Sequence, residues 1–152
     1  MISLDDYWNR FLKEKNLPLS TPFGGELTFS SDEHNFAIIM ALILSGRKTA
    51  QFSALPAYQI DFEPLPQKST YYVLNDWHGE PAGVLKTTNV TVLPFEEITW
   101  EMARKEGEDT CIEDWRDRYR EFFTEDSEIT GYDFTPSMPV VFEEFELVWQ
   151  GR

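Results

Sequence analysis

The chain has 152 residues, 41% of them apolar, and a formal net charge of −14. This length fits one globular domain of ordinary size, and the longest apolar run, at 36–44, is too short to cross a bilayer. A lone cysteine, Cys111, excludes an internal disulfide, and two histidines are too few for a zinc site of Cys and His. The first residues lack the pattern of a secretory signal. We therefore expect a cytoplasmic protein with no metal, no cofactor and no membrane segment.

The negative charge is concentrated in the second half of the chain. Residues 96–146 contain 17 acidic and five basic side chains, whereas the rest contains 10 and eight. Such acidity opposes extensive contact with nucleic-acid phosphates. It is typical of solvated helix faces, or of a docking surface for a basic protein partner. We expect a binding site on the nearly neutral surface formed by the rest of the chain.

The first part of the chain predicts two helices. Residues 3–16 place apolar side chains at three- and four-residue spacing, as an amphipathic helix does. Residues 19–30 suit an irregular connection or a short extended piece. A second helix is expected to begin at Ser31, which can cap it, and to end at Gly46. Because its body is apolar on nearly every side, we expect it to pack inside the domain.

Short extended segments follow at 50–53, 71–74 and 82–93, the last rich in valine and threonine. The turn at 76–81 predicts that the second and third segments pair as an antiparallel hairpin. Pro94 is expected to end the last of them.

The acidic half predicts two more helices and a final strand. Thr99 can cap a short helix that ends at Gly107, and residues 110–113 match a capping box that opens a longer helix. The predicted buried stripe of this helix consists of Ile112, Trp115, Tyr119, Phe122 and Phe123. Residues 140–149 alternate well enough to close the sheet, with Glu143 as the misfit. The mixture of elements favours an α+β fold with a small, curved sheet or barrel.

The most specific passage is 45–53, where the apolar helix ends on Gly46 and two cations, Arg47 and Lys48, lead into a strand. Such cations commonly do no more than complement a helix C-terminus. The run from Gly46 to Thr49, however, resembles the G-x-K-T signature of ASCH domains, a family related to the PUA domains of RNA-modifying enzymes.

Three further segments resemble the same family in the same order. Residues 80–88 are similar to its strand after the first hairpin, 103–108 to its A-x-x-E-G-E helix end, and 115–123 to its W-R…FF helix. The resemblance covers residues 31–152 and implies an α+β fold with a small PUA-like β-barrel and flanking helices. We expect residues 1–30 to form an N-terminal helix and connection that pack on the barrel as part of one globular unit.

The resemblance also implies a site. In ASCH domains the motif lysine projects into a cleft that is taken to bind RNA or a nucleotide, which assigns this role to Lys48 with Arg47 beside it. A lysine can meet a phosphate or a base carbonyl, and an arginine presents a planar fork. Thr49, Gln51 and Ser53 follow on the same strand and complete the predicted ligand-binding set. The aromatic rings of Tyr71, Tyr72 and Trp77 can stack on a base or belong to the packing.

One branch of the family hydrolyses the amide of an acylated cytidine with a lysine, a threonine three residues later and a distant glutamate. Lys48 and Glu106 match two of these residues, but Gln51 stands where the threonine nucleophile is required. Ser53 lies about 6.6 Å beyond Gln51 along the strand, at ~3.3 Å per residue, and Thr49 lies the same distance before Gln51. Neither hydroxyl can take the place of the threonine without a changed geometry. An amide cannot be the nucleophile, whereas it can donate and accept hydrogen bonds with a base.

The sequence therefore favours a domain that binds RNA, a nucleotide or a modified nucleoside without efficient turnover. An amidohydrolase of the N4-acetylcytidine type, a ribonuclease and an acidic protein-interaction domain remain as alternatives. Glu106 is either a site residue or a solvated carboxylate paired with Lys105. Trp115 is expected in the core, Arg116 as a brace, and both histidines, His34 and His78, in exposed positions.

Overall fold

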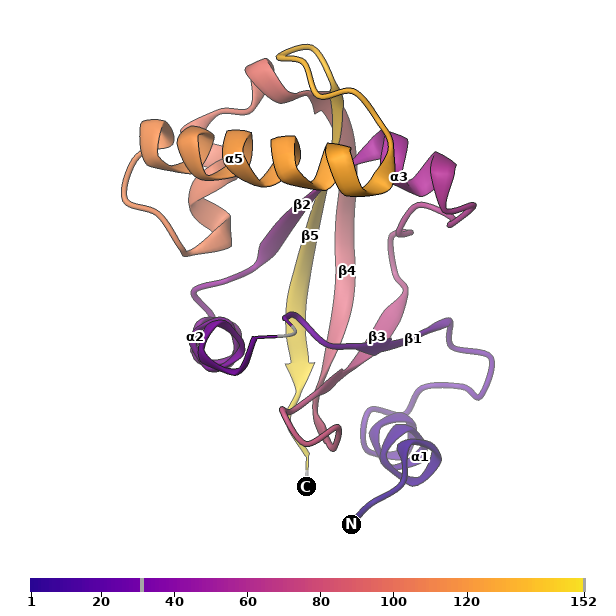
Figure 1. The fold of residues 1–152 in the computed structure, drawn as a ribbon. Coiled ribbons are helices and arrows are strands. Elements are labelled where there is room, and N and C mark those ends of the chain that lie inside the picture. The colour runs from indigo at the N-terminus through magenta and orange to yellow at the C-terminus, as the bar shows by residue number, and fades with distance from the viewer. Residues whose placement is uncertain (31, 152) are drawn as a thin grey trace. The chain divides into compact units, whose positions relative to one another are not determined.

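The structure is a computed structural model that describes residues 1–30 and 32–151 (Figure 1). Its helices are α1 (Leu4–Glu14), α2 (Glu33–Leu44), α3 (Leu55–Ile60), α4 (Trp100–Ala103) and α5 (Ile112–Thr130), with short 3-10 helices η1 (Phe95–Glu97) and η2 (Arg104–Glu106). Its strands are β1 (Phe23–Leu27), β2 (Ala50–Ala54), β3 (Tyr71–Asn75), β4 (Pro81–Pro94) and β5 (Pro139–Trp149). The strands form a mixed sheet in the order β1-β3-β4-β5-β2, so the predicted α+β class is confirmed.

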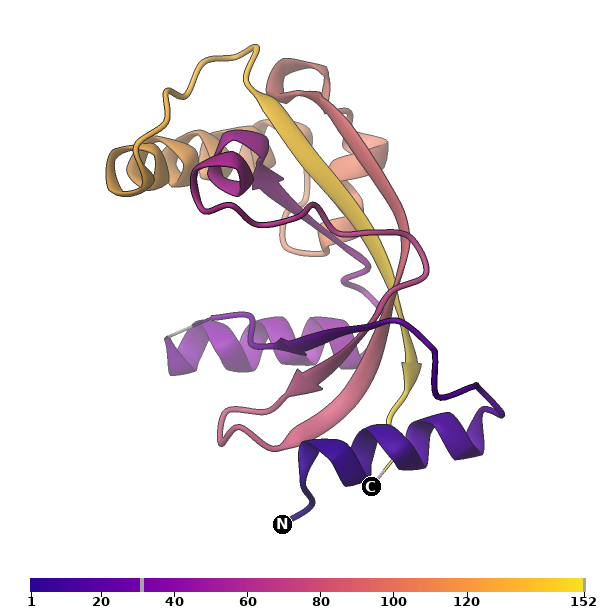
Figure 2. The same ribbon diagram turned by 90° about the vertical axis from the view of Figure 1, so that its right-hand side faces the viewer.

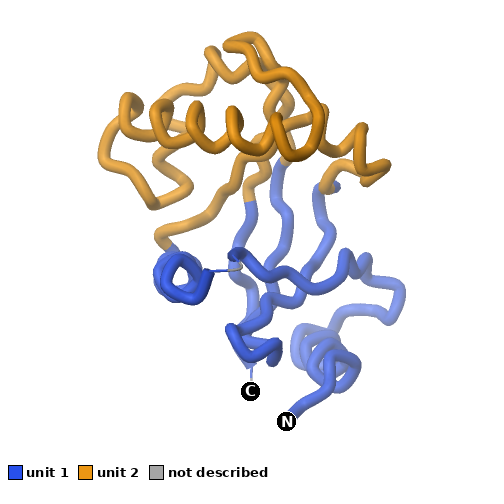
Figure 3. Tube along the Cα trace, viewed as in Figure 1, with its two compact units in different colours: residues 1–46, 67–89, 145–152 blue, residues 47–66, 90–144 orange. Residues whose placement is uncertain are grey.

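The chain divides into two compact units (Figure 3). Unit 1 contains residues 1–46, 67–89 and 145–152, and unit 2 contains residues 47–66 and 90–144. Each unit has apolar clusters of its own, and the long strands β4 and β5 contribute residues to both.

Unit 1 is built on the predicted hairpin of β3 and β4, which pair antiparallel with Tyr71 opposite Lys86. Strand β1 adds to β3 in parallel. Successive residues of a strand face opposite sides of a sheet, so Val73 and Leu74 belong to different apolar clusters. Helix α1 packs on the side of Val73, and α2 packs on the side of Leu74. Figure 2 shows the two helices on either side of the hairpin.

Helix α2 differs from its prediction in two ways. Its N-cap is Asp32, and the predicted cap, Ser31, lies outside the described residues. The expectation that the helix is packed on nearly every side is wrong, because Ile38 is 47% exposed and Leu44 is also exposed. Phe36, Met40 and Ile43 recur at helical spacing and form the buried face, with Ile39 packed against its edge, whereas Ile38 and Leu44 face outward.

Unit 2 is organised by β2 and β5, which pair antiparallel with Phe52 opposite Phe142. The aromatic residues of α5 pack on this pair. The core residues Trp115, Tyr119 and Phe123 of the predicted stripe are buried, whereas Phe122 is exposed.

Three details of unit 2 differ from expectation. The N-cap of α5 is Cys111 and makes no side-chain capping bond, so the predicted capping box is wrong. The Thr110 hydroxyl instead donates to the Asp114 carboxylate at 3.4 Å. Helix α3 was not predicted; Pro56 in its first turn is a typical start signal. The predicted cap of α4 is confirmed, since the Thr99 hydroxyl accepts the Met102 N–H.

Candidate functional site

The segment after Gly46 is held against the turn that follows η2 by backbone contacts. The Thr49 N–H donates to the Lys105 carbonyl at 2.8 Å. Gly107 has a φ of 76°, and a Cβ there would lie 2.8 Å from the Arg47 carbonyl oxygen. Only glycine tolerates both this dihedral and this approach. The G-x-K-T and A-x-x-E-G-E segments therefore meet within unit 2.

Lys48 is buried where these segments meet, with 3% of its side chain exposed. Its ammonium donates to the Glu108 carboxylate at 3.1 Å and lies 3.6 Å from the Glu106 carboxylate. The structure thus brings together the two residues, Lys48 and Glu106, that the sequence singled out as catalytic candidates.

Glu106 is held by α5 as well as by Lys48. One carboxylate oxygen accepts the Trp115 indole N–H at 3.0 Å and an Arg118 N–H at 2.8 Å. The other oxygen accepts the Tyr119 hydroxyl. A buried carboxylate must have such partners, because desolvation of an unpaired charge is very costly. The alternative pairing with Lys105 is wrong, since Lys105 pairs with Glu144 in the structure.

Arg118 connects the remaining acids. It binds the Asp109 carboxylate with its Nε and Nη2 atoms, and its Nη1 lies 4.0 Å from Glu108. We call Lys48, Glu106, Glu108, Asp109 and Arg118 the ion cluster. It holds three carboxylates against two cations, so it carries a net negative charge when all five groups are ionised.

The ion cluster changes the acidity of its neighbours. Burial, together with the adjacent Glu106 charge, raises the pKa of the Tyr119 phenol well above its ordinary value. Burial alone would lower the pKa of Arg118, but the bond to Asp109 and the charge of Glu106 outweigh it and raise that pKa. Tyr119 is therefore a firm proton donor to Glu106, and Arg118 is a permanent cation.

The other predicted ligand residues make separate contacts. The Gln51 amide donates to Glu143 at 2.8 Å, which explains how the misfit Glu143 of β5 is accommodated opposite Gln51. The Ser53 hydroxyl shares a hydrogen bond of 2.9 Å with Tyr58. The Thr49 hydroxyl donates to the Lys105 carbonyl at 3.4 Å, and Arg47 is exposed.

Sequence reasoning missed Glu108, Asp109, Arg118 and Tyr119 as members of this arrangement. A signal was present, because Glu108 and Asp109 directly follow Glu106, and Arg118 lies three residues after Trp115 on the same side of α5. Trp115 is buried as expected, yet its indole N–H also serves Glu106. His34 and His78 are exposed, as predicted.

The rings singled out for stacking belong to unit 1. Tyr71 packs on Phe11 and Trp8, and the Lys86 ammonium lies 5.6 Å from the centre of its ring. Trp77 is partly exposed and contacts Phe36.

Comparison with known proteins settles the family. The family model of the ASCH domain matches residues 26–149. The chain belongs to the ASCH domain family. No match is found among curated proteins.

Two solved structures resemble the whole chain. Protein EF3133 from Enterococcus faecalis V583 is 26% identical, with a TM-score of 0.84 over 97% of this chain and 88% of that one. An ASCH domain from Lactobacillus crispatus JV V101 is 27% identical, with a TM-score of 0.80 over 93% of this chain and 94% of that one. The PUA-like fold expected from the motifs is therefore shared with ASCH structures.

Two searches concern the described part of the chain only. Within residues 1–30 and 32–151, no three His, Cys, Asp or Glu side chains are grouped so that they could hold a metal ion. No helix in those residues has the length and hydropathy needed to cross a membrane.

Proposed function

We propose that this ASCH domain binds a nucleobase-containing ligand through Lys48, with Gln51 and Arg47 as further contacts, and does not turn it over efficiently. The observation that carries the proposal is the Lys48 ammonium in the ion cluster. An ammonium has three N–H donors. One N–H donates to Glu108, and a second is directed at Glu106, which lies at the longer distance of 3.6 Å. The third N–H is available to a carbonyl or hydroxyl of the ligand.

The charge of the ion cluster favours a neutral ligand. Three carboxylates surround two cations, and unit 2 as a whole contains 18 acidic and seven basic residues. A phosphate placed beside Lys48 would meet net negative charge, whereas a nucleobase or nucleoside would not. A phosphorylated ligand would depend on the exposed Arg47 instead. We therefore expect a nucleoside, including a modified one, to bind better than the corresponding nucleotide or RNA.

Three features of the site oppose efficient hydrolysis. A hydroxyl nucleophile must lose its proton to a base, and the Lys48 amine is already engaged by Glu106 and Glu108 rather than by a hydroxyl. Gln51 offers no hydroxyl at the required position. The hydroxyl groups of Thr49 and Ser53 are bonded to Lys105 and Tyr58, respectively.

Thermal shift and calorimetry with cytidine, N4-acetylcytidine, cytidine monophosphate and a short single-stranded RNA test the proposal. At a hundredfold excess over Kd, a bound nucleoside should stabilise the wild type by about 2.7 kcal/mol. Lys48→Met should abolish this shift, and the matched control Lys105→Met, which breaks a partly exposed lysine pair nearby, should keep it. Because Lys48→Met can itself unfold the chain, Gln51→Ala serves as a milder variant and should weaken binding. The proposal is wrong if no nucleoside stabilises the wild type or if Lys48→Met and Lys105→Met bind equally.

The contact between Lys48 and Glu106 specifically favours one alternative, an amidohydrolase for acylated nucleosides. Chromatography of N4-acetylcytidine after incubation would then show cytidine with the wild type but not with Glu106→Gln. Gln51→Thr, which introduces the hydroxyl that the family uses, should increase the rate. If no variant, including Gln51→Thr, releases cytidine, this alternative is excluded. Parallel incubations with short RNA test the ribonuclease activity.

A further inference from the structure

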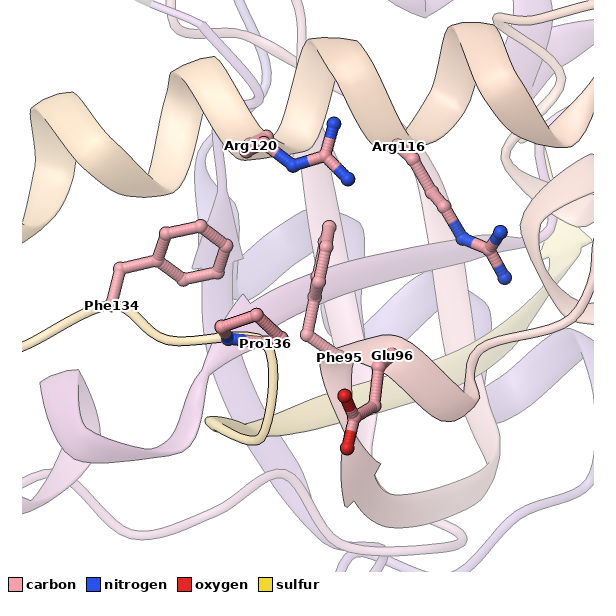
Figure 4. A pocket seen from close by; sticks show the side chains of 6 residues that line it. All are labelled: Phe95, Glu96, Arg116, Arg120, Phe134 and Pro136. Carbon is pink, nitrogen blue, oxygen red and sulfur yellow. The ribbon is translucent and has the colours of Figure 1, made fainter.

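A second candidate site lies in unit 2 outside the ion cluster. It is a pocket of about 190 Å³ lined by Phe95, Glu96, Arg116, Arg120, Phe134 and Pro136 (Figure 4). Three segments contribute to it: η1, the first half of α5, and the loop that follows α5.

The walls of the pocket are held in place by backbone and ring contacts. The Phe95 N–H donates to the Met138 carbonyl and the Glu96 N–H to the Pro136 carbonyl, both at 2.9 Å. The Phe95 ring stacks on Trp115 at 5.6 Å and meets Phe134 edge-on at 5.2 Å between ring centres. The apolar part of the pocket is therefore formed before any ligand arrives.

Two arginines line the same pocket, because Arg116 and Arg120 lie one turn apart on α5. Arg120 pairs with Asp117 at 3.0 Å and remains 57% exposed. Arg116 donates from Nη2 to the Ile98 carbonyl at 3.2 Å. Figure 4 shows the Glu96 carboxylate on the far side of the Phe95 ring from the Arg120 guanidinium.

Arg116 is the unusual member of this pair. Its Nε is shielded from solvent without a hydrogen-bond partner, and no carboxylate in residues 1–30 and 32–151 lies within ion-pair distance of it. A shielded donor without an acceptor is unfavourable. An oxyanion in the pocket would supply the opposite charge that Arg116 lacks.

We propose that this pocket binds a small monocarboxylate with a compact apolar body. The carboxylate would meet the guanidinium groups of Arg116 and Arg120, whose planar forks match its geometry, and the body would contact Phe95, Phe134 and Pro136. The volume of about 190 Å³ favours a ligand smaller than a nucleotide, since pockets for drug-sized ligands have about 300 Å³ or more. A dianionic phosphate is disfavoured by the excess of acidic residues in unit 2.

Calorimetry and ¹⁵N NMR, including the arginine Nε–H signals, test this with benzoate as the probe. Benzamide is the neutral isostere and phenyl phosphate the dianionic one, all at equal ionic strength. We expect saturable benzoate binding with a Kd in the millimolar range or below, and benzamide about tenfold weaker, as for the loss of one charge-assisted contact. The shifted signals should be those of Phe95, Phe134, Arg116 and Arg120.

The chain offers a matched control for the variants. Arg104 pairs with Glu101 in the same i,i+3 arrangement as Arg120 with Asp117, is 53% exposed, and lies outside the pocket. Arg120→Gln should weaken benzoate about threefold to tenfold, and Arg104→Gln should leave it unchanged. Arg116→Lys keeps the charge but loses the fork, and should also weaken it.

Three outcomes would overturn the proposal: no saturable benzoate binding, equal affinity for benzamide, or equal losses in Arg120→Gln and Arg104→Gln. Tighter binding of phenyl phosphate than of benzoate would overturn the choice of a monocarboxylate. Binding that persists in Arg120→Gln and shifts signals elsewhere would show that benzoate occupies another surface.

Discussion

The hydrogen bond from Tyr119 to Glu106 links the ion cluster to the behaviour of the protein at alkaline pH. Burial and the Glu106 charge raise the pKa of this phenol well above 10.0, near which it ionises in the unfolded chain. Above that pH the folded protein keeps a proton that the unfolded chain loses. The raised pKa of Tyr119 therefore contributes fully to the free energy of unfolding below pH 10.0. Above that pH its contribution falls, by up to about 1.4 kcal/mol per pH unit for one proton.

Urea unfolding between about pH 8 and about pH 11 measures this slope. Tyr119→Phe should lower the free energy of unfolding near neutral pH by about 1–3 kcal/mol, because Glu106 loses a donor, and should flatten the alkaline fall. Burial also raises the pKa of Tyr132, so Tyr132→Phe should flatten the same slope independently. An unchanged slope in Tyr119→Phe would show that this phenol ionises in the folded protein as it does in the unfolded chain.

Gly107 lies where the G-x-K-T and A-x-x-E-G-E segments meet, and it gives a second prediction. Gly107 and Gly79 have φ values of 76° and 81°, but an added Cβ meets the Arg47 backbone only at Gly107. Gly79→Ala should cost about 1–2 kcal/mol of unfolding free energy for the left-handed backbone. Gly107→Ala should cost about 1–3 kcal/mol more because of the clash. Equal losses in thermal or urea unfolding would mean that the turn moves away from Arg47 without cost.

Helix α2 predicts a contrast between its two faces. Ile38 is exposed and Ile43 is buried against β3 and β4, although the sequence around both is apolar. Ile38→Lys should change the unfolding free energy by no more than about 0.5 kcal/mol, whereas Ile43→Lys should cost about 4 kcal/mol or more. Denaturant titration of both variants measures the difference. A large loss in Ile38→Lys would contradict the exposed face.

The elements that could be predicted are those whose signal is local. Helix α1 and the β3–β4 hairpin follow from spacing and turn residues that lie close together in the sequence. Helix α3 is only six residues long, which is too short for periodicity to show. The start of α5 was misplaced because a capping-box pattern at 110–113 does not require that the side chains use it. Phe122 and Phe123 are adjacent phenylalanines, so the sequence alone does not show that Phe122 is exposed and Phe123 buried.

The candidate site was predictable only in part, since its contacts join distant segments. The meeting of Lys48 with Glu106 came from resemblance to a family, because spacing alone gives no distance across 58 residues. The bond between Gln51 and Glu143 depends on the register of β2 with β5, which neither strand specifies by itself. Arg118 was not singled out either, because its contacts with Glu106 and Asp109 depend on how α5 packs against the turn after η2.

The net charge of −14 predicts how stability responds to salt. Repulsion among acidic side chains opposes the folded state, and salt screens exposed charges more than buried ones. Raising sodium chloride from about 20 mM to about 500 mM should therefore raise Tm by a few degrees. The double variant Glu113→Lys, Asp117→Lys, at exposed positions of α5, should show a smaller rise. A fall in Tm with salt would mean that attractive ion pairs outweigh the repulsion.

The order in which the chain builds its two units limits how the protein can be shortened. Unit 1 is assembled from three separate stretches and unit 2 from two, so neither is an uninterrupted piece of polypeptide. A truncated gene that begins at Arg47 would still encode the whole of β3 and β4, but not helices α1 and α2, whose side chains cover Val73 and Leu74. Such a product would present bare β-sheet to the solvent, and aggregation rather than a smaller working domain is the expected result.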